Sequence, residues 1–217
     1  AILKLYERLL LSRINSESMI KFNPLQCGFQ KGIGCNMTSF MLRECVYFTK
    51  ENKSKLYTCF LDVKTAFDKV WQNGLFHKLH DMGNKLFSWK SIVNLHADLE
   101  SCVLFKGFQS DFFSIHVGTR QGGICSPFLY LCFIDPFIWR LEHLNMGFKL
   151  NGVKVPAIVS ADDMTLLAYT KPELDRMIKE CYNYSCLWRY EYNAKKSAVI
   201  VCNESKSLYK KSERYWV

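Results

Sequence analysis

The sequence predicts an α+β fold, with a mainly antiparallel sheet packed on helices. The 217 residues are 49% apolar and 23% charged, which suffices for the core of one domain, or of one domain with two lobes. Helical and strand-like apolar patterns interleave along the chain. No segment approaches the roughly 18 apolar residues of a membrane span. The most apolar one, residues 128–139, is broken by Asp135 and Pro136.

The first half of the chain is expected to be helical around one buried strand. Helical spacing covers residues 2–14, 38–48, 67–82 and 87–99. In the first of these helices Ile2, Leu5 and Leu9, together with Ile14, are expected to share one side. Residues 56–63 are rich in β-formers and apolar on both faces, which predicts a buried strand that runs into Asp62.

Strand-like patterns are more frequent in the second half. They cover residues 102–105, 112–117, 155–160, 164–169 and 198–201. The first two are expected to form one hairpin around Gly107, and the next two a hairpin with acids at its tip. Ser126 as N-cap and Pro127 as first residue are expected to open a helix over residues 128–144. A capping box at residues 170–173 opens the last helix.

The charge balance favours a polyanionic partner. The chain has 29 basic and 20 acidic residues, a net charge of +9. Residues 1–100 carry 14 basic and 9 acidic side chains and the remainder carries 15 and 11, so the excess is not a basic tail. A diffuse positive field makes nucleic acid a candidate partner.

The ten cysteines are predicted to be reduced thiols, because most lie inside apolar runs and no C-x-x-C pair occurs. Their usage points to an intracellular protein. His77 and His80 have near-ligand spacing without an adjacent cysteine or second histidine pair, so a zinc site is not expected.

Three aspartates stand in unusual contexts. Asp62 ends a strand that should be buried, and Asp162 and Asp163 are adjacent at a hairpin tip. Neighbouring acids repel and lose hydration beside a core, whereas a divalent cation such as Mg²⁺ compensates them. Two such ions about 4 Å apart would activate a hydroxyl and hold a leaving pyrophosphate. Taken alone, the pair also fits a solvated turn, and Asp62 also fits a capping or salt-bridged acid.

Five short motifs, in order, resemble those of reverse transcriptases. Along the chain they are a fingers motif at residues 26–29, F-x-D-x-x-x-A-F-D at 60–68, G-x-x-Q-G-x-x-x-S-P at 118–127, Y-A-D-D without its tyrosine at 160–163, and N-x-x-K-[ST] at 193–197. The resemblance runs from about residue 5 to about residue 202. It is to non-LTR (LINE-type) retrotransposons rather than to retroviruses.

This resemblance implies the fingers and palm of a right-hand RNA-directed DNA polymerase. The fingers would be approximately residues 1–55 and 84–120, the palm approximately 56–83 and 121–203, and residues 204–217 the start of a missing thumb or linker. Asp62 and Asp162 would hold two Mg²⁺ ions, with Mn²⁺ as an alternative, and Asp163 would assist. The implied partners are an RNA template, a DNA primer and dNTPs. No membrane association is expected, and the implied location is the nucleus.

The remaining implied roles concern the nucleotide. The backbone carbonyl after Asp62, at Val63, would add a metal ligand, and Phe67 would close the sugar pocket against a 2′-OH. Gln121 and Gly122 would line the base and template side. Without the motifs, Phe67 would be read as core and residues 121–123 as a simple turn.

Three more residues are implied to act on the nucleic acid or on the leaving group. Lys196 would protonate the pyrophosphate, although it also fits a solvated lysine. Arg120 and the surrounding basic surface would follow phosphates of the RNA–DNA hybrid. Ser160 stands where the family has an aromatic residue at the primer end.

The chain departs from the family pattern at Ser160, at Thr65, which replaces a lysine, and at Gly123, which replaces an acid. No thumb, endonuclease or terminal zinc knuckle is visible in the sequence. The five motifs together predict template-directed joining of dNTPs. The departures leave open the alternative of a decayed module that only binds nucleic acid. A two-metal phosphotransferase unrelated to polymerases is a second rival, but it leaves residues 118–127 unexplained.

Overall fold

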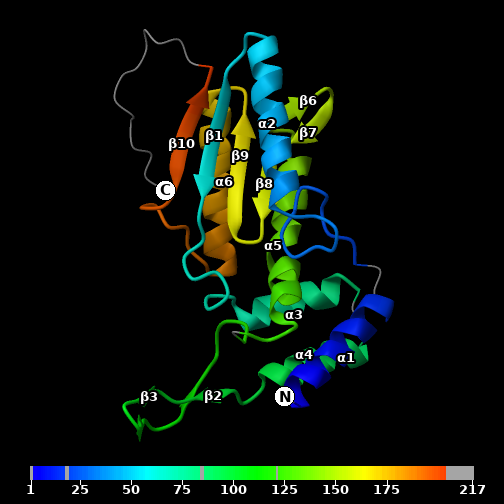
Figure 1. The fold of residues 1–217 in the computed structure, drawn as a ribbon, viewed down its shortest axis with the longest axis vertical. Coiled ribbons are helices and arrows are strands. Elements are labelled where there is room, and N and C mark those ends of the chain that lie inside the picture. Colours follow the sequence, from blue (N-terminus) through cyan, green and yellow to red (C-terminus); the bar gives the residue numbers. More distant parts are fainter. Residues whose placement is uncertain (1, 18–19, 84–85, 121, 204–217) are drawn as a thin grey trace. The chain divides into compact units, whose positions relative to one another are not determined.

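The computed structural model describes residues 2–17, 20–83, 86–120 and 122–203. The chain divides into two compact units, one of residues 1–21 and 67–133 and the other of residues 22–66 and 134–217. Helices and antiparallel strands occur together in both units, which confirms the predicted α+β class (Figure 1).

The unit of residues 22–66 and 134–217 is built on a four-stranded antiparallel sheet. Its strands, in spatial order, are β10 (Ala198–Cys202), β1 (Leu56–Leu61), β9 (Asp163–Ala168) and β8 (Ala157–Ser160). Ser160 pairs with Asp163, so β8 and β9 form a hairpin closed by Ala161 and Asp162. This hairpin and its acidic tip confirm the sequence prediction.

Helices cover this sheet. α6 (Lys171–Trp188) packs against β1 and β9 and lies behind the sheet in Figure 1, while α2 (Cys35–Glu51) packs against β8 and β1. The predicted capping box begins α6, because the Thr170 side chain accepts a hydrogen bond from the Glu173 amide. A small separate hairpin is formed by β6 (Phe148–Leu150) and β7 (Val153–Val155).

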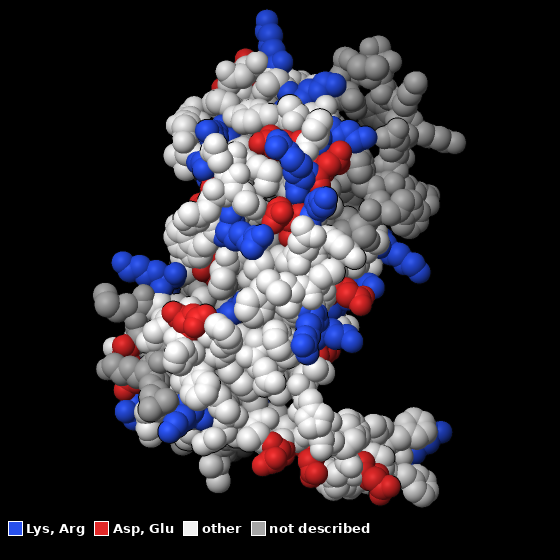
Figure 2. Space-filling view, turned by 180° about the vertical axis from the view of Figure 1, so that it is seen from behind, with Lys and Arg blue, Asp and Glu red and all other residues white. Residues whose placement is uncertain are grey.

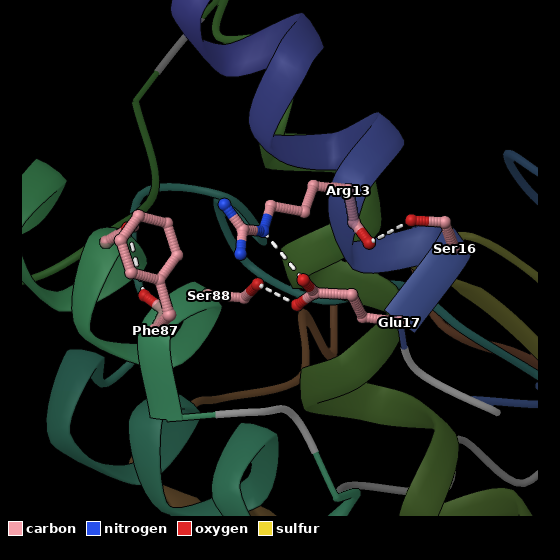
Figure 3. A network of polar contacts seen from close by, with 6 residues as sticks. Arg13, Ser16, Glu17, Phe87 and Ser88 are labelled. Atoms are coloured by element: carbon pink, nitrogen blue, oxygen red, sulfur yellow. Dashed lines mark hydrogen bonds and ion pairs between the residues drawn. The ribbon is translucent and has the colours of Figure 1, made fainter.

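The unit of residues 1–21 and 67–133 is mainly helical. Its helices are α1 (Ile2–Glu17), α3 (Gln72–Asp81), α4 (Leu86–His96) and the first part of α5 (Ser126–His143). α1 and α3 each pack against α4. Figure 3 shows the polar contact between α1 and α4, where Glu17 accepts hydrogen bonds from Arg13 at 2.7 Å and Ser88 at 2.9 Å. The Arg13 guanidinium also lies 4.2 Å from the centre of the Phe87 ring.

The predicted hairpin around Gly107 is wrong in its pairing. The short strands are β2 (Glu100–Ser101), β3 (Leu104–Phe105), β4 (Phe108–Gln109) and β5 (Phe113–Ser114). β3 pairs with β4, and β2 pairs with β5. Lys106 and Gly107 both have positive φ, so a two-residue turn reverses the chain directly after β3. The second predicted strand therefore meets β2 instead of β3.

Two predicted helix starts are also corrected. The helix expected over residues 67–82 begins only at Gln72, because residues 64–69 form turns in which Thr65 has a φ of 45°. The helix α5 begins at Ser126, the residue that was expected to be its N-cap: Leu129 donates its amide to the Cys125 carbonyl, and the Ser126 hydroxyl donates to the Arg120 carbonyl.

The apolar side of α1 matches the expected one only in part. Ile14 is buried as expected, but Ile2, Leu5 and Leu9 are exposed, and the other buried residues of this helix are Glu7 and Leu10. A carboxylate is costly to bury without partners, so the orientation of α1 indicates that Glu7 is held by specific bonds.

All ten cysteines lie in the described part of the chain, and none forms a disulfide, as predicted. Burial, with the neighbouring Glu44, raises the pKa of the Cys45 thiol to about 11, so this thiol stays protonated and unreactive. Among the described residues, no helix is long and apolar enough to cross a membrane.

Candidate active site

The predicted catalytic aspartates meet at one end of the four-stranded sheet. Leu61, the last residue of β1, pairs with Met164 on the antiparallel strand β9. Asp62 follows Leu61, and Asp163 precedes Met164, so the register continues from that pair to the two aspartates. Asp162 stands in the adjoining turn and, like Asp62, is half-buried.

These carboxylates affect one another electrostatically. Partial burial raises the pKa of Asp163, and the charges of Asp162 and Asp62 raise it further, while Lys196 lowers it. The sheet thus concentrates negative charge at one end of its two central strands, where binding of a cation is favoured. Within the described ranges no three His, Cys, Asp or Glu side chains are placed as a complete metal cage.

Lys196 lies at the same end of the sheet. It stands in the segment just before β10, which pairs with β1 on the side opposite β9. Its Nζ atom lies 3.9 Å from Oδ2 of Asp62, and its side chain is 69% exposed. The lysine is therefore mobile enough to approach a bound anion while remaining beside the carboxylate.

The segment before β10 brings Lys196 to this position. Val63 is buried and forms an isolated antiparallel bridge with Tyr192, and Asn193 donates its amide to the Asp62 carbonyl at 2.7 Å. The Asn193 carbonyl then accepts from the amides of Lys196 and Ser197, which folds residues 193–197 into a turn. The N-x-x-K-[ST] pattern is thus a turn anchored to the backbone of the first aspartate.

The residues present fit a magnesium site. Carboxylate oxygens are ligands that Mg²⁺ prefers, and Mg²⁺ commonly takes only a few of them together with substrate phosphate oxygens. Asp62 retains 26% exposure of its side chain, so it is open to such a shared ion. An incomplete protein cage is therefore compatible with a metal that arrives with a nucleotide.

The other predicted nucleotide contacts lie in the mainly helical unit. The Phe67 carbonyl accepts from the Thr119 amide at 2.8 Å, and the Gly118 amide donates to the Val70 carbonyl at 2.8 Å. The half-buried Phe67 ring packs on Tyr130 with centroids 4.9 Å apart. The structure thus brings Phe67 together with the beginning of the 118–127 motif.

The contact between residues 67–70 and 118–119 requires glycine at position 118 for two reasons. Its φ is +87°, and a Cβ atom would lie 2.9 Å from the Asp68 carbonyl oxygen. Further along the motif, Gly122 is exposed and has a φ of +72°. Gln121 lies outside the described residues, so its predicted contact with the base or template stays a prediction.

Glu7 is a residue that the sequence patterns missed. Its side chain is nearly fully buried, and Oε2 accepts a hydrogen bond from the Ile124 amide at 2.6 Å. Oε1 lies 3.6 Å from the Arg120 guanidinium. Glu7 therefore contacts both Arg120 and Ile124, and the Arg120 guanidinium has an anionic partner. The sequence signal for Glu7 was an acid placed among the apolar residues of a predicted helix.

Charges are mixed on the face of the molecule that Figure 2 shows. On the face shown in Figure 2, lysine and arginine side chains are interspersed with aspartate and glutamate rather than gathered in one stripe. This agrees with the even distribution of charge along the chain.

Comparison with known proteins gives the family. The family model described as reverse transcriptase (RNA-dependent DNA polymerase) matches residues 1–215. The Pol polyprotein from the type-1 retrotransposable element R2 of Popillia japonica is 26% identical over 202 residues, which are 92% of this chain and 28% of that protein. The RNA-directed DNA polymerase from the mobile element jockey of Drosophila funebris is 34% identical over 209 residues, 91% of this chain and 22% of that protein.

Solved structures show the same fold at lower identity. Telomerase from Candida tropicalis in complex with a TWJ fragment of telomeric RNA aligns with a TM-score of 0.65 and 14% identity, over 89% of this chain and 33% of that one. The chain spans about a quarter of the length of the two curated relatives. With a family match over almost its whole length, and with polymerases of retrotransposable elements as relatives, the chain belongs to the reverse transcriptase family, in its non-LTR retrotransposon group.

Proposed function

We propose that this chain is the fingers-and-palm part of a retrotransposon reverse transcriptase, which joins dNTPs to the 3′-hydroxyl of a DNA primer on an RNA template. The observation that carries the proposal is the meeting of Asp62, Asp163 and Lys196 at the end of β1 and β9, beside Asp162. We also propose the fingers and palm boundaries given above and a nuclear location, as the family resemblance implies.

The carboxylates supply the binding site for Mg²⁺. Asp62 and Asp162 would hold two ions, with Asp163 assisting and the carbonyl of Val63 adding a ligand. When bound, such ions lower the pKa of an attacking hydroxyl and stabilise a leaving pyrophosphate. Mn²⁺ would serve as an alternative ion, since it prefers the same oxygen ligands.

The chain's own groups supply the remaining chemistry. The Lys196 ammonium would donate its proton to the leaving pyrophosphate oxygen, which then departs with less negative charge. The Phe67 ring would lie under the sugar and exclude a 2′-OH, and Gln121 and Gly122 would line the base. Arg120 would contact backbone phosphate, and Ser160 would lie at the primer end.

The direct test is primer extension by the 217-residue chain on poly(rA)/oligo(dT) with dTTP, in Mg²⁺ and in excess EDTA. A polymerase gives extended primer only in Mg²⁺. The second candidate, a module that only binds nucleic acid, is favoured by the serine at position 160. It would retain the duplex in a binding assay and leave the primer length unchanged in both conditions.

A further inference from the structure

We propose that Gln26 is a positioning residue, which fixes the turn that carries Asp162 through a hydrogen bond to Ala161. The inference rests on the proposed function, because it assigns to Gln26 a part in the same carboxylate site. All the atoms involved belong to the unit of residues 22–66 and 134–217.

The segment that holds Gln26 runs parallel to β8. The Cys27 amide donates to the Val159 carbonyl at 2.7 Å, and the Val159 amide donates to the Leu25 carbonyl at 2.9 Å. Gln26 itself is bridged with Val159 and is completely buried. These bonds place the Gln26 side chain one residue short of the end of β8, close to the turn.

The Gln26 side chain is committed to two backbone amides. Its Oε1 atom accepts from the Ala161 amide at 3.0 Å and from the Gly28 amide at 2.8 Å. Because both partners are N–H donors, the oxygen must face them, and this fixes the orientation of the side-chain amide. The Nε2 atom has no hydrogen-bond partner among the described residues. A fully buried amide with one unused end is costly, which argues that the bonds at its other end are worth keeping.

Ala161 needs such support. Its φ is +59°, a left-handed conformation that an alanine rarely adopts, and its side chain is buried. Conformations of this kind persist only where the surroundings enforce them. The backbone of Gly28 also lies against this residue, because a Cβ atom at position 28 would be 2.2 Å from the Ala161 nitrogen. The turn is thus held by the Gln26 amide oxygen and by close backbone packing.

The hydrogen bond to Ala161 affects the carboxylate site because Asp162 is the next residue in the chain. The Ala161 amide that Gln26 binds belongs to the Ser160–Ala161 peptide, and the φ of +59° at Ala161 relates this peptide to the next one, which carries Asp162. Loss of the bond would let that angle change, and the Asp162 carboxylate would move with it. A displacement near 1 Å at a reacting centre costs about 10²-fold in rate. Gln26 does not touch substrate in this account, so its effect should be on the rate of chemistry and not on nucleotide affinity.

The test compares three variants with the wild-type chain. Gln26→Met keeps the length of the side chain and removes the acceptor, whereas Gln26→Glu keeps an acceptor for both amides. Gln30→Met is the matched control, since Gln30 donates from Nε2 to the carbonyl of Gln26 and, within the described part of the chain, its side chain makes no hydrogen bond to residues 160–163. The readouts are Ala161 amide exchange by NMR and single-turnover extension per active molecule at varied dTTP.

We expect Gln26→Met to expose the Ala161 amide to exchange and to lower the single-turnover rate by about 10²-fold at unchanged half-saturating dTTP. Gln26→Glu should stay within about tenfold of wild type, and Gln30→Met should match it. An unchanged rate per active molecule in Gln26→Met would overturn the proposal, as would equal losses in Gln26→Met and Gln26→Glu. If the wild-type chain extends no primer, the proposed function fails, and the inference is then judged on Ala161 exchange: equal protection in wild type and Gln26→Met would overturn it.

Discussion

Ser160 is the residue at which the candidate site departs from the family pattern, and the structure places it at the end of β8, opposite Asp163. An aromatic side chain there would support the primer end, which serine cannot do. We expect Ser160→Tyr to raise the single-turnover extension rate by about tenfold or more, with little change in duplex affinity. Rapid-quench kinetics with a separate duplex titration measures both. A rate gain explained wholly by tighter binding would show that serine is a tolerated variant.

Phe67 is the residue that should distinguish sugars. It precedes helix α3 in a turn, packs on Tyr130 and is half-buried. A ring beneath the sugar leaves no room for a 2′-OH. We expect Phe67→Val to raise UTP incorporation relative to dTTP by about 10-fold to 100-fold, measured by competition in one primer-extension assay. An unchanged ratio would make Phe67 an ordinary packing residue.

Asp135 is a buried acid outside the candidate site, and it should make stability depend on pH. Burial raises its pKa to about 6, against the opposing hydrogen bonds from the Asn23 amide and the Trp139 indole, and Glu142 raises it further. The folded chain therefore binds more protons than the unfolded chain between pH about 4 and 6, so this group's contribution to stability falls as pH rises through that range.

We expect wild type to gain about 1 kcal/mol of unfolding free energy from this group between pH 7 and pH 5. Asp135→Asn should lack this gain, because an amide does not titrate. Urea denaturation of both proteins at the two pH values measures the difference. The same pH slope in both would contradict the assignment.

At the scale of elements, the connection between residues 67–71 and 117–119 depends on Gly118. Gly118→Ala should lower the unfolding free energy by about 2 to 3 kcal/mol, since it adds both a strained φ and a contact with the Asp68 carbonyl oxygen. Gly107→Ala is the control: its φ is +85° and no atom lies within 4 Å of the added Cβ, so it should cost only about 1 kcal/mol. Equal costs in urea denaturation would show that the Asp68 contact is unimportant.

Most elements follow from local patterns in the sequence. The β8–β9 hairpin was predictable from two apolar runs separated by acids, and α6 from its capping box. The exposed face of α1 was not, because Glu7 faces inward to bond Ile124, which is 117 residues away. The spacing of apolar residues within one helix gives no information about a hydrogen bond to a residue so distant in the sequence. The nested pairing of β2 with β5 was missed because the turn at Lys106 reverses the chain early.

At the scale of the whole molecule, the sequence indicated candidate site residues more readily than their arrangement in space. The aspartates were recognisable from their motifs, but the pairing of β10 with β1 was not, and this pairing brings Lys196 within 3.9 Å of Asp62. The hydrogen bond between Gln26 and Ala161, next to Asp162, was not predicted either, since residues 26–29 were interpreted only as a fingers motif. Strand order depends on the free energy of the complete sheet, which no single segment reports.

We propose that the carboxylates at the end of β1 and β9 make this chain a Mg²⁺-dependent polymerase. Extension of oligo(dT) on poly(rA) by wild type, Asp62→Asn and Glu191→Gln tests this proposal. Glu191 is the control because it is an exposed acid that pairs with Lys64 near the same strand end. Loss of an ion-binding carboxylate costs several kcal/mol of barrier, which is about 10³-fold in rate. We expect Mg²⁺-dependent extension by wild type and Glu191→Gln and a loss of about this size in Asp62→Asn. Equal extension by Asp62→Asn and wild type would contradict it.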